Sequence, residues 1–345
     1  MAAPEYPFAE PPAPGATAEV APGVHWLRMA LPFALDHINL WLLEDGGGIV
    51  IVDTGLGNAP TRALWEKIFA ARIGARPRID DVGRVLVTHY HPDHAGNAAW
   101  LCERTGAQLW MTRGEYLTVH AALHGAAGYS AESQKKLFLA NGLGEAQTNE
   151  LLARGGLYRK LVPDFPLSHR RLFEGERIAV GGREWRVMVG YGHAPEHASL
   201  YCESLNVLIS GDMLLPRIST NVAVRPVDPW SNPLHAFLES VRRYLPLPKD
   251  VLVLPSHGMP FRGAHDRVAQ LEAHHAERLR ELRAACAQAP RAAADVLEVL
   301  FKRKLDTGQI FFALGEAIAH LHYLHYDGQL AREVGSDGIV RFAPV

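Results

Sequence analysis

The stretch Val85-Leu86-Val87-Thr88-His89-Tyr90-His91-Pro92-Asp93-His94 decides both the fold and the chemistry expected of this chain. Three histidines and one aspartate fall within six positions, directly after an apolar run. The run predicts a buried strand, so the polar cluster lies where a strand ends and a loop begins. Imidazole nitrogens and carboxylate oxygens are ligands of zinc and other first-row divalent metals. A lone histidine near a core is usually a packing residue, but four such groups together predict a metal site.

Further residues of the same kind follow other short apolar runs. Asp53 comes directly after the apolar run 49–52. His193, Asp212 and His257 likewise follow the ends of later apolar runs. A rigid sheet fixes the side chains at its strand ends, which is where a preorganised metal site should be built. The sequence therefore predicts that residues far apart along the chain meet the cluster at 89–94.

The composition is that of a globular protein with a sizeable core. A chain of 345 residues suggests about two domains, or one domain with an appendage, at roughly 150 residues per domain. Hydrophobic residues make up 48% and charged residues 21%, which is ordinary for such proteins. The net charge of −2 gives no electrostatic case for nucleic acid or for an anionic membrane surface.

Three cysteines, Cys102, Cys202 and Cys286, are scattered without paired spacing. This pattern argues against disulfides and favours a reducing compartment. The N-terminus lacks the basic region and apolar core of a secretory signal. No run approaches ~18 uncharged apolar residues, so no transmembrane helix is expected, and the simplest location is the cytoplasm.

Strands and helices alternate through most of the chain, which predicts a layered α/β fold. The predicted strands are 24–29, 39–44, 49–52, 85–87, 108–111, 170–173, 178–180, 184–189, 199–202, 207–210 and 251–254. The predicted helices between them are 59–71, 95–104 and 233–245.

Three segments interrupt this alternation. Residues 1–20 are rich in proline and predict a flexible lead-in to a main domain at 21–263. Residues 113–165 predict a helical insertion, which could be a lid, a substrate wall or a cover for the sheet. Its predicted helices are 115–123, 131–140 and 145–153. Residues 264–345 predict a helical, winged-helix-like C-terminal domain, with helices at 265–289, 291–301 and 310–326 and a hairpin of 329–334 with 339–342.

These residues resemble the metallo-β-lactamase superfamily over about residues 20–260. The landmarks are Val-Asp53-Thr-Gly, His89-x-His91-x-Asp93-His94, Gly-His193, Ser-Gly-Asp212 and Ser-His257-Gly. Together these five landmarks are specific, whereas any one alone is weak. Within the superfamily the chain resembles hydrolases of glyoxalase II type, and its C-terminal segment looks like the winged-helix extension of a subgroup that includes the LACTB2-like hydrolases.

The resemblance implies an αββα sandwich with a two-metal site between its sheets. The implied ligands of one ion are His89, His91 and His193, those of the other are Asp93, His94 and His257, and the bridging ligand is Asp212. Asp53 would lie beneath the site, or it would cap backbone amides of the turn Thr54–Gly57, or both. Asp93 is also the candidate catalytic residue.

The chemistry of such a site agrees with hydrolysis. Two divalent ions ~3.5–4 Å apart lower the pKa of a bridging water, so that hydroxide forms near neutral pH and attacks a carbonyl or phosphorus. A ligand set without cysteine is unlike a closed structural zinc site and leaves positions open for water and substrate. Zinc is the default pair of ions, and iron or manganese could use the same ligands.

The third landmark departs from the family pattern. The family often has Gly-His-Thr-x-Gly-Ser/His, whereas this chain has Gly192-His193-Ala194-Pro195-Glu196-His197. His197 could support a metal ligand or could simply begin a strand. Tyr191 and Arg217 are further candidates for the pocket around the metals.

The expected substrate is a small carboxylic ester or thioester, as for a thioesterase of glyoxalase II type or a lactonase. Five basic residues could anchor an anionic part of such a substrate or could simply be surface charges: Arg113, Lys135, Lys136, Arg217 and Arg225. The alternative is an endoribonuclease or phosphodiesterase of LACTB2-like type. Residues 291–345 contain six Arg or Lys against seven Asp or Glu, which argues against nucleic acid. A non-hydrolytic, iron-dependent member with a C-terminal region that forms a homodimer is a further alternative.

Overall fold

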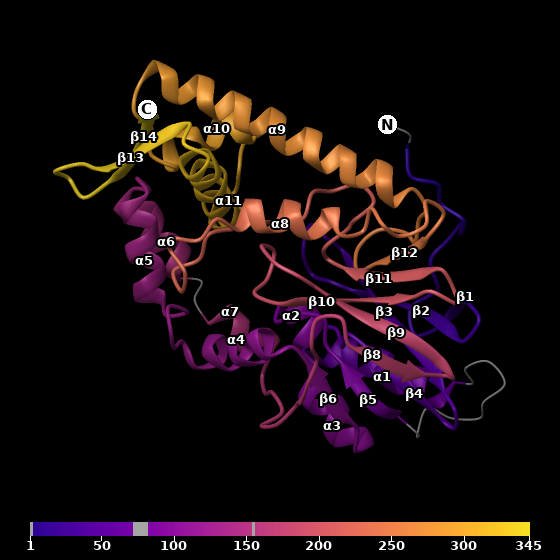
Figure 1. Cartoon of the computed structure of the whole chain (residues 1–345). Helices are drawn as coiled ribbons and strands as arrows, with labels where there is room; N and C mark the ends of the chain where they lie inside the picture. Colours follow the sequence, from indigo (N-terminus) through magenta and orange to yellow (C-terminus); the bar gives the residue numbers. More distant parts are fainter. Residues whose placement is uncertain (1–2, 72–81, 154–155) are drawn as a thin grey trace.

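The computed structural model describes residues 3–71, 82–153 and 156–345 and contains two large β-sheets stacked face to face (Figure 1). The first sheet has seven strands in the order β1-β2-β3-β4-β5-β6-β7, and the second has five in the order β12-β11-β10-β9-β8. Helices cover the outer face of each sheet. This arrangement confirms the predicted αββα sandwich.

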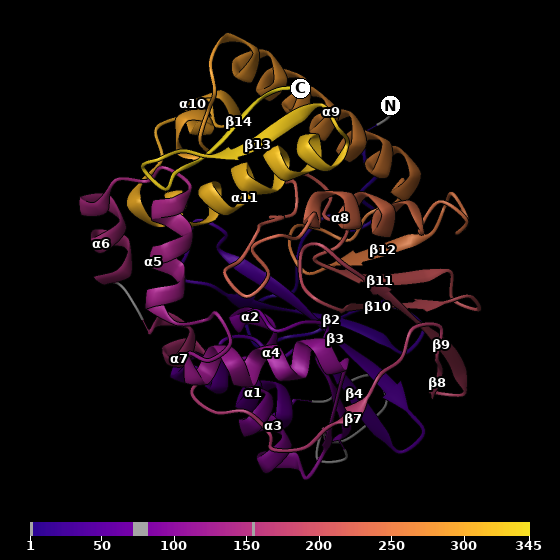
Figure 2. The ribbon, with the colours of Figure 1, turned by 60° about the vertical axis from the view of Figure 1, so that its left-hand side comes forward.

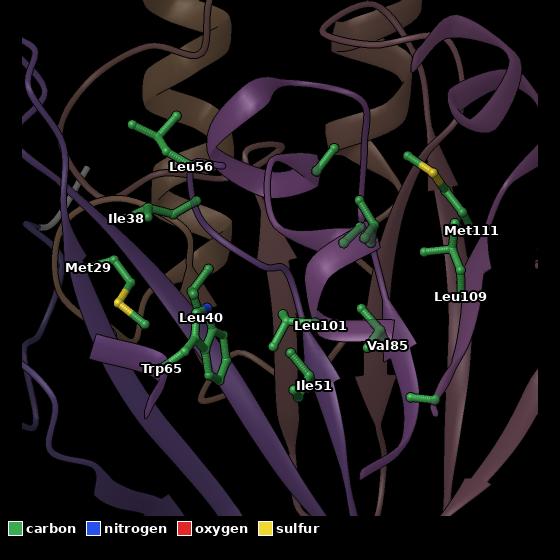
Figure 3. Packing of buried hydrophobic residues seen from close by; sticks show 14 of the residues in the cluster. Met29, Ile38, Leu40, Ile51, Leu56, Trp65, Val85, Leu101, Leu109 and Met111 are labelled. Carbon is green, nitrogen blue, oxygen red and sulfur yellow. The ribbon is translucent and has the colours of Figure 1, made fainter. Parts of the chain in front are cut away.

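The first sheet begins antiparallel and ends parallel. Its strands are β1 (Ala18–Ala21), β2 (Val24–Ala30), β3 (His37–Asp45), β4 (Gly48–Val52), β5 (Val82–Leu86), β6 (Gln108–Met111) and β7 (Arg170–Arg171). The strands from β4 to β7 pair in parallel. Parallel sheets need cover on both faces, which explains their unbroken apolar runs. Helices α1 (Ala59–Ala70) and α3 (Ala98–Thr105) cover the outer face, where Trp65 and Leu101 meet Leu40, Ile51 and Val85 (Figure 3).

The second sheet is antiparallel except at one edge. Its strands are β8 (Arg177–Val180), β9 (Arg183–Gly190), β10 (His197–Cys202), β11 (Val207–Gly211) and β12 (Leu252–Pro255). Strands β11 and β12 pair in parallel. Helix α8 (Pro233–Arg242) and the first part of α9 (Ala264–Gln288) cover the outer face of this sheet through Phe237 and Val268. Between the two sheets, Trp26 and Trp41 pack against Val189 and Ile209.

The helical insertion consists of α4 (Arg113–His124), α5 (Ala131–Ala140), α6 (Glu145–Ala153) and α7 (Leu157–Leu161). The C-terminal part continues from α9 into α10 (Leu297–Leu300), α11 (Thr307–Tyr326) and the hairpin β13 (Leu330–Val334) with β14 (Val340–Pro344). The two parts touch, because Phe138 of α5 packs with Leu314 and Phe342. Figure 2 shows α5 and α6 beside α11 and the yellow hairpin.

The structure corrects two predicted helices. The helix predicted at 95–104 begins only at Ala98, as α3, and a separate short helix, α2 (Pro92–Ala95), precedes it. A Cβ at Gly96 would lie 2.4 Å from the Gly57 nitrogen, and Asn97 donates to the Leu56 carbonyl. The segment between the two helices therefore packs closely against the loop that contains Leu56 and Gly57. The helix predicted at 291–301 shrinks to a 3₁₀ turn (Ala294–Val296) followed by α10.

The N-terminal segment has defined contacts where the sequence predicted a flexible lead-in. Glu5 forms a β-bridge with Arg262, and Phe8 packs edge-on against Trp26. Strand β1 extends the first sheet by pairing with β2. Among the described residues, no helix is long and apolar enough to cross a membrane.

Candidate metal centre

The histidines and aspartates singled out in the sequence come from both sheets and meet at one edge of the sandwich. The cluster from His89 to His94 occupies the loop after β5 and helix α2. His193 follows β9, Asp212 follows β11 and His257 follows β12. The potential ligand atoms form two groups, and within each group they lie within 4.8 Å of one another. One group is His89, His91, His193 and Asp212, and the other is Asp93, His94 and His257.

The first group has the spacing that a tetrahedral ion requires. Ligands ~2.0–2.1 Å from a tetrahedral zinc are about 3.3 Å from one another. His89 Nε2 lies 2.9 Å from His91 Nδ1 and 3.2 Å from His193 Nε2. Asp212 Oδ2 lies 3.3 Å from His193 Nε2. The four side chains can therefore surround one ion.

The second group shares Asp212 with the first. His257 Nε2 lies 3.5 Å from Asp93 Oδ2, and His94 Nε2 lies 3.8 Å from the same oxygen. The other carboxylate oxygen of Asp212, Oδ1, is 3.5 Å from His94 Nε2 and 3.4 Å from His257 Nε2. Asp212 thus turns one oxygen to each group, which is the geometry of a bridging carboxylate.

Two buried atoms favour a cation at this site. His94 Nε2 and Asp212 Oδ1 are buried without a hydrogen-bond partner among the described residues. Such orphaned polar atoms are costly unless an ion or water satisfies them. The nitrogen- and oxygen-only donor set fits zinc, iron or manganese, so the residues present suit two divalent ions.

The electrostatics agree with that assignment. Burial lowers the pKa of His89 and His91 well below the ordinary value, so both rings are neutral and able to bind a metal. Burial alone would also lower the pKa of His94 and His257, but nearby carboxylates, Asp212 among them, raise both. These carboxylates favour positive charge at the centre, which a bound metal ion would supply.

Backbone carbonyls orient the outer histidines. His193 Nδ1 lies 2.7 Å from the Asn221 carbonyl, and His257 Nδ1 lies 2.7 Å from the His37 carbonyl. A ring that donates from Nδ1 presents an unprotonated Nε2 to the metal. The loop after Asp212 and strand β3 therefore fix the tautomers of two ligands.

Asp53 lies beneath the second group and is 1% exposed. Its Oδ2 is 2.7 Å from His94 Nδ1, and its Oδ1 accepts from the backbone amide of Thr88 at 2.8 Å. Its backbone has a φ of 62°, which is uncommon outside glycine and stores strain at this point. Asp53 therefore lies beneath the site and contacts the candidate ligand His94, as one of the two predicted roles requires. The backbone amide that it caps is that of Thr88 and does not belong to the turn at 54–57.

His197 both begins strand β10 and supports the bridging aspartate. Burial lowers the pKa of His197 to about 3, so its neutral ring accepts a hydrogen bond from the Asp212 amide, at 3.1 Å. A Cβ at Gly211 would lie 2.3 Å from His197 Nε2, so this approach requires the glycine before Asp212.

The structure does not bring the other two pocket candidates to the cluster. Tyr191 is 44% exposed, and its amide donates to Ser240 Oγ. Arg217 is exposed and stacks on Tyr6, with 5.5 Å from its guanidinium carbon to the ring centre. Within the described residues, neither side chain contacts a member of the two groups.

A pair of glutamates that sequence reasoning missed holds two ligand loops together. Glu115 of α4 is fully buried and accepts from the amides of Tyr90, at 2.9 Å, and Glu196, at 2.6 Å. Glu196 in turn accepts from the Gly114 amide at 2.8 Å. Burial raises the pKa of Glu115 to about 8. No local pattern marks Glu115 in the sequence, because it looks like an ordinary helical glutamate.

Two known protein families match this chain, and together they cover most of it. Residues 34–257 match the family described as the metallo-β-lactamase superfamily. Residues 279–345 match the description "Metallo-beta-lactamase-like, C-terminal domain". The first match spans all seven candidate ligands.

Two solved structures are similar along nearly the whole chain. A β-lactamase domain protein from Burkholderia ambifaria is 49% identical, with a TM-score of 0.91 over 99% of this chain and 98% of that one. A metallo-β-lactamase family protein from Thermus thermophilus is 31% identical, with a TM-score of 0.79 over 95% of this chain and 100% of that one.

Relatives with functional names are more distant. The probable metallo-hydrolase YqjP of Bacillus subtilis is 25% identical over 308 residues, which are 86% of this chain and 91% of that protein. Human acyl-coenzyme A thioesterase MBLAC2 is 23% identical over 197 residues, which are 56% of this chain and 63% of that protein. The match to the thioesterase thus spans less than two thirds of its length.

Proposed function

This chain belongs to the metallo-β-lactamase superfamily and is a metal-dependent hydrolase, and we propose that it cleaves a carboxylic ester or thioester at a centre of two divalent ions. The observation that carries the proposal is the position of Asp212, whose two oxygens face the two ligand groups separately. We propose zinc for both positions, with iron or manganese as the alternatives that these ligands allow.

The protein side chains prepare this centre for hydrolysis. When bound, two divalent ions would lower the pKa of water and polarise the carbonyl oxygen of a substrate. Asp93 turns Oδ2 toward His94 and His257. Its second oxygen makes no hydrogen bond within the described part of the chain, so we assign that oxygen to hold a proton from the attacking water. From there the proton can pass to the leaving group.

An ester or thioester is favoured over a nucleic acid by two considerations. The C-terminal residues 291–345 carry more acidic than basic side chains, whereas a nucleic-acid module would be clearly basic. Acyl-coenzyme A thioesterases are among the distant curated relatives. The phosphodiesterase alternative enters the test below as a measured outcome.

The test is a hydrolysis screen of zinc-loaded protein with thioesters, lactones and one phosphodiester, bis(p-nitrophenyl) phosphate. We expect thioester or lactone hydrolysis that falls at least ~100-fold in Asp93→Ala, because that change removes both a ligand and the proton acceptor. The matched control is Asp250→Ala. Asp250 is exposed and precedes β12 at the end opposite His257, so activity should persist. Cleavage of the phosphodiester alone would contradict the proposal.

A further inference from the structure

We propose that Arg225, together with the Nε2–H of His91, forms a subsite for a carboxylate group carried by the substrate. The inference rests on the proposed function and narrows its substrate class to esters or thioesters with a second, anionic carboxylate close to the bond that is cleaved. The sequence offered five cationic anchors without distinguishing among them. The structure distinguishes them by their contacts.

Arg225 is the cation of those five that reaches a candidate metal ligand. Its Nη2 lies 3.4 Å from His91 Nε2. Lys135 and Lys136 instead lie 3.6 Å from Glu145 and 3.5 Å from Glu132. Arg113 is exposed at the start of α4, and Arg217 stacks on Tyr6.

The contact between Arg225 and His91 joins two hydrogen-bond donors. His91 turns Nδ1 into the first ligand group, 2.9 Å from His89 Nε2. A ring that binds a metal through Nδ1 carries its hydrogen on Nε2, and guanidinium nitrogens only donate. Two donors 3.4 Å apart cannot satisfy each other, so the pair needs an acceptor that both can reach. A carboxylate, with two oxygens, is such an acceptor.

The guanidinium also lacks a protein counter-charge. Within residues 3–71, 82–153 and 156–345, no carboxylate lies within ion-pair distance of Arg225. The guanidinium carbon lies 5.8 Å from the centre of the Tyr90 ring, and burial raises the pKa of Tyr90, so this neighbour is neutral and supplies no counter-charge. One uncompensated positive charge matches one carboxylate, whereas a phosphate monoester would bring about two negative charges.

The loop that carries Arg225 is held from two sides. The Val224 amide donates to the Gly315 carbonyl of α11 at 3.0 Å. A Cβ at Gly128 of the insertion would lie 2.6 Å from Val227 Cα, so the insertion packs tightly on the other side of the arginine. A charged group held in this way is preorganised for a ligand.

A pair of substrates tests the subsite. Succinyl-N-acetylcysteamine and its methyl-ester-capped analogue differ only in whether the distal carboxylate is free. We expect the wild type to prefer the free carboxylate at least ~10-fold in kcat/KM, because a charge-assisted bidentate contact is strong. Arg225→Gln should bring the ratio close to one, and Arg225→Lys should restore part of it. Arg217→Gln is the matched control and should keep the wild-type ratio.

A binding measurement separates failure of the subsite from failure of the proposed function. Calorimetric titration of zinc-loaded protein with succinate and with monomethyl succinate needs no turnover. The wild type should bind succinate at least ~10-fold more tightly, and Arg225→Gln should lose the difference. Circular dichroism verifies that each variant is folded. Equal affinity for both acids in the wild type would overturn the subsite, even if the enzyme hydrolyses neutral thioesters. Succinate discrimination without any ester hydrolysis would instead contradict the proposed function.

Discussion

Asp212 connects the two halves of the centre, because each of its oxygens faces a different ligand group. Asparagine has nearly the same shape but offers one oxygen and one amide nitrogen that does not bind metal. We therefore expect Asp212→Asn to lose about one equivalent of metal and at least ~100-fold in kcat/KM. Elemental analysis after desalting gives the stoichiometry. Asp250→Asn is the control, and full metal occupancy in Asp212→Asn would contradict the bridging role.

Glu115 provides a test of stability at the residue scale. Its buried carboxyl group accepts hydrogen bonds from two backbone amides in separate ligand loops, and above its pKa of about 8 it does so as a carboxylate. Glutamine can accept only one of them and turns its amide group toward the other. A buried unsatisfied donor costs ~1–3 kcal/mol, so Glu115→Gln should lower the free energy of unfolding by about that amount. Urea denaturation at about pH 9, where Glu115 is ionised, measures this loss, with the exposed Glu103→Gln as control. A decrease in the free energy of unfolding of less than ~0.5 kcal/mol would show that the two hydrogen bonds accepted by Glu115 do not stabilise the fold.

The metal-type residues were predictable from sequence because their signal is local. Each follows an apolar strand, and strand ends of stacked sheets meet at one edge. Arg225 was named but could not be separated from the other cations, because what distinguishes it is its distance to His91. Glu115 gave no signal, and Asn221 stood out only as part of the loop after Asp212, since their roles arise from packing with segments distant in sequence.

At the scale of elements, α11 links the C-terminal part to the metal centre. Glu316 accepts from the Asn221 side chain at 3.2 Å, and the Asn221 carbonyl in turn lies 2.7 Å from His193 Nδ1. Asn221 and Glu316 are 95 residues apart in the sequence, so no local sequence pattern predicts their hydrogen bond. The C-terminal helices therefore support a ligand of the first group and the loop that bears Arg225.

The pH dependence of stability tests the burial of Glu316. Burial raises its pKa from the ordinary 4.5 to about 7, so between these values the folded chain holds a proton that the unfolded chain releases. The stability gained in this way is full below the lower value and is lost as pH rises through the higher one. Glu316→Gln removes the titration, so its stability relative to wild type should improve by ~2–3 kcal/mol between about pH 5 and about pH 8.

Urea denaturation across that range, with the exposed Glu333→Gln as control, measures the effect. A relative stability of Glu316→Gln that is constant with pH would show that Glu316 titrates normally.

Local element predictions failed where tertiary contacts overrode propensity. Helix formers run through residues 95–104, yet α2 ends at Ala95 and α3 begins only at Ala98, where Gly57 approaches Gly96 closely. Proline-rich residues near the N-terminus look unstructured by composition, yet Phe8 finds an aromatic partner in Trp26. Helices 131–140 and 145–153 matched their predicted bounds because glycines lie close to their ends.

At the scale of the whole molecule, residues on both sides of the predicted domain boundary at residue 263 pack into the same hydrophobic cores. Val268 of α9 packs with Phe237 under the second sheet, and Phe342 packs with Phe138 of the insertion. A unit cut at this boundary would expose apolar surface on both pieces.

We therefore expect the chain to unfold cooperatively in one step. All seven tryptophans precede residue 264, and all except Trp230, which lies against Arg332, belong to the sandwich. Their fluorescence therefore mainly reports the sandwich, whereas far-UV ellipticity is weighted by the long helices α9 and α11. The two signals should give coincident urea transitions. Separate transitions would show that the C-terminal residues 264–345 form an independent domain. Light scattering on the protein without urea tests whether it forms the homodimer considered from the sequence.

The most direct test of the central claim is a crystal structure of the zinc-loaded protein with anomalous scattering recorded at the zinc edge. The account predicts two anomalous peaks ~3.5–4 Å apart, with Asp212 between them. His89, His91 and His193 should hold one ion, and Asp93, His94 and His257 the other. A single peak, or two ions without a shared Asp212 carboxylate, would contradict it.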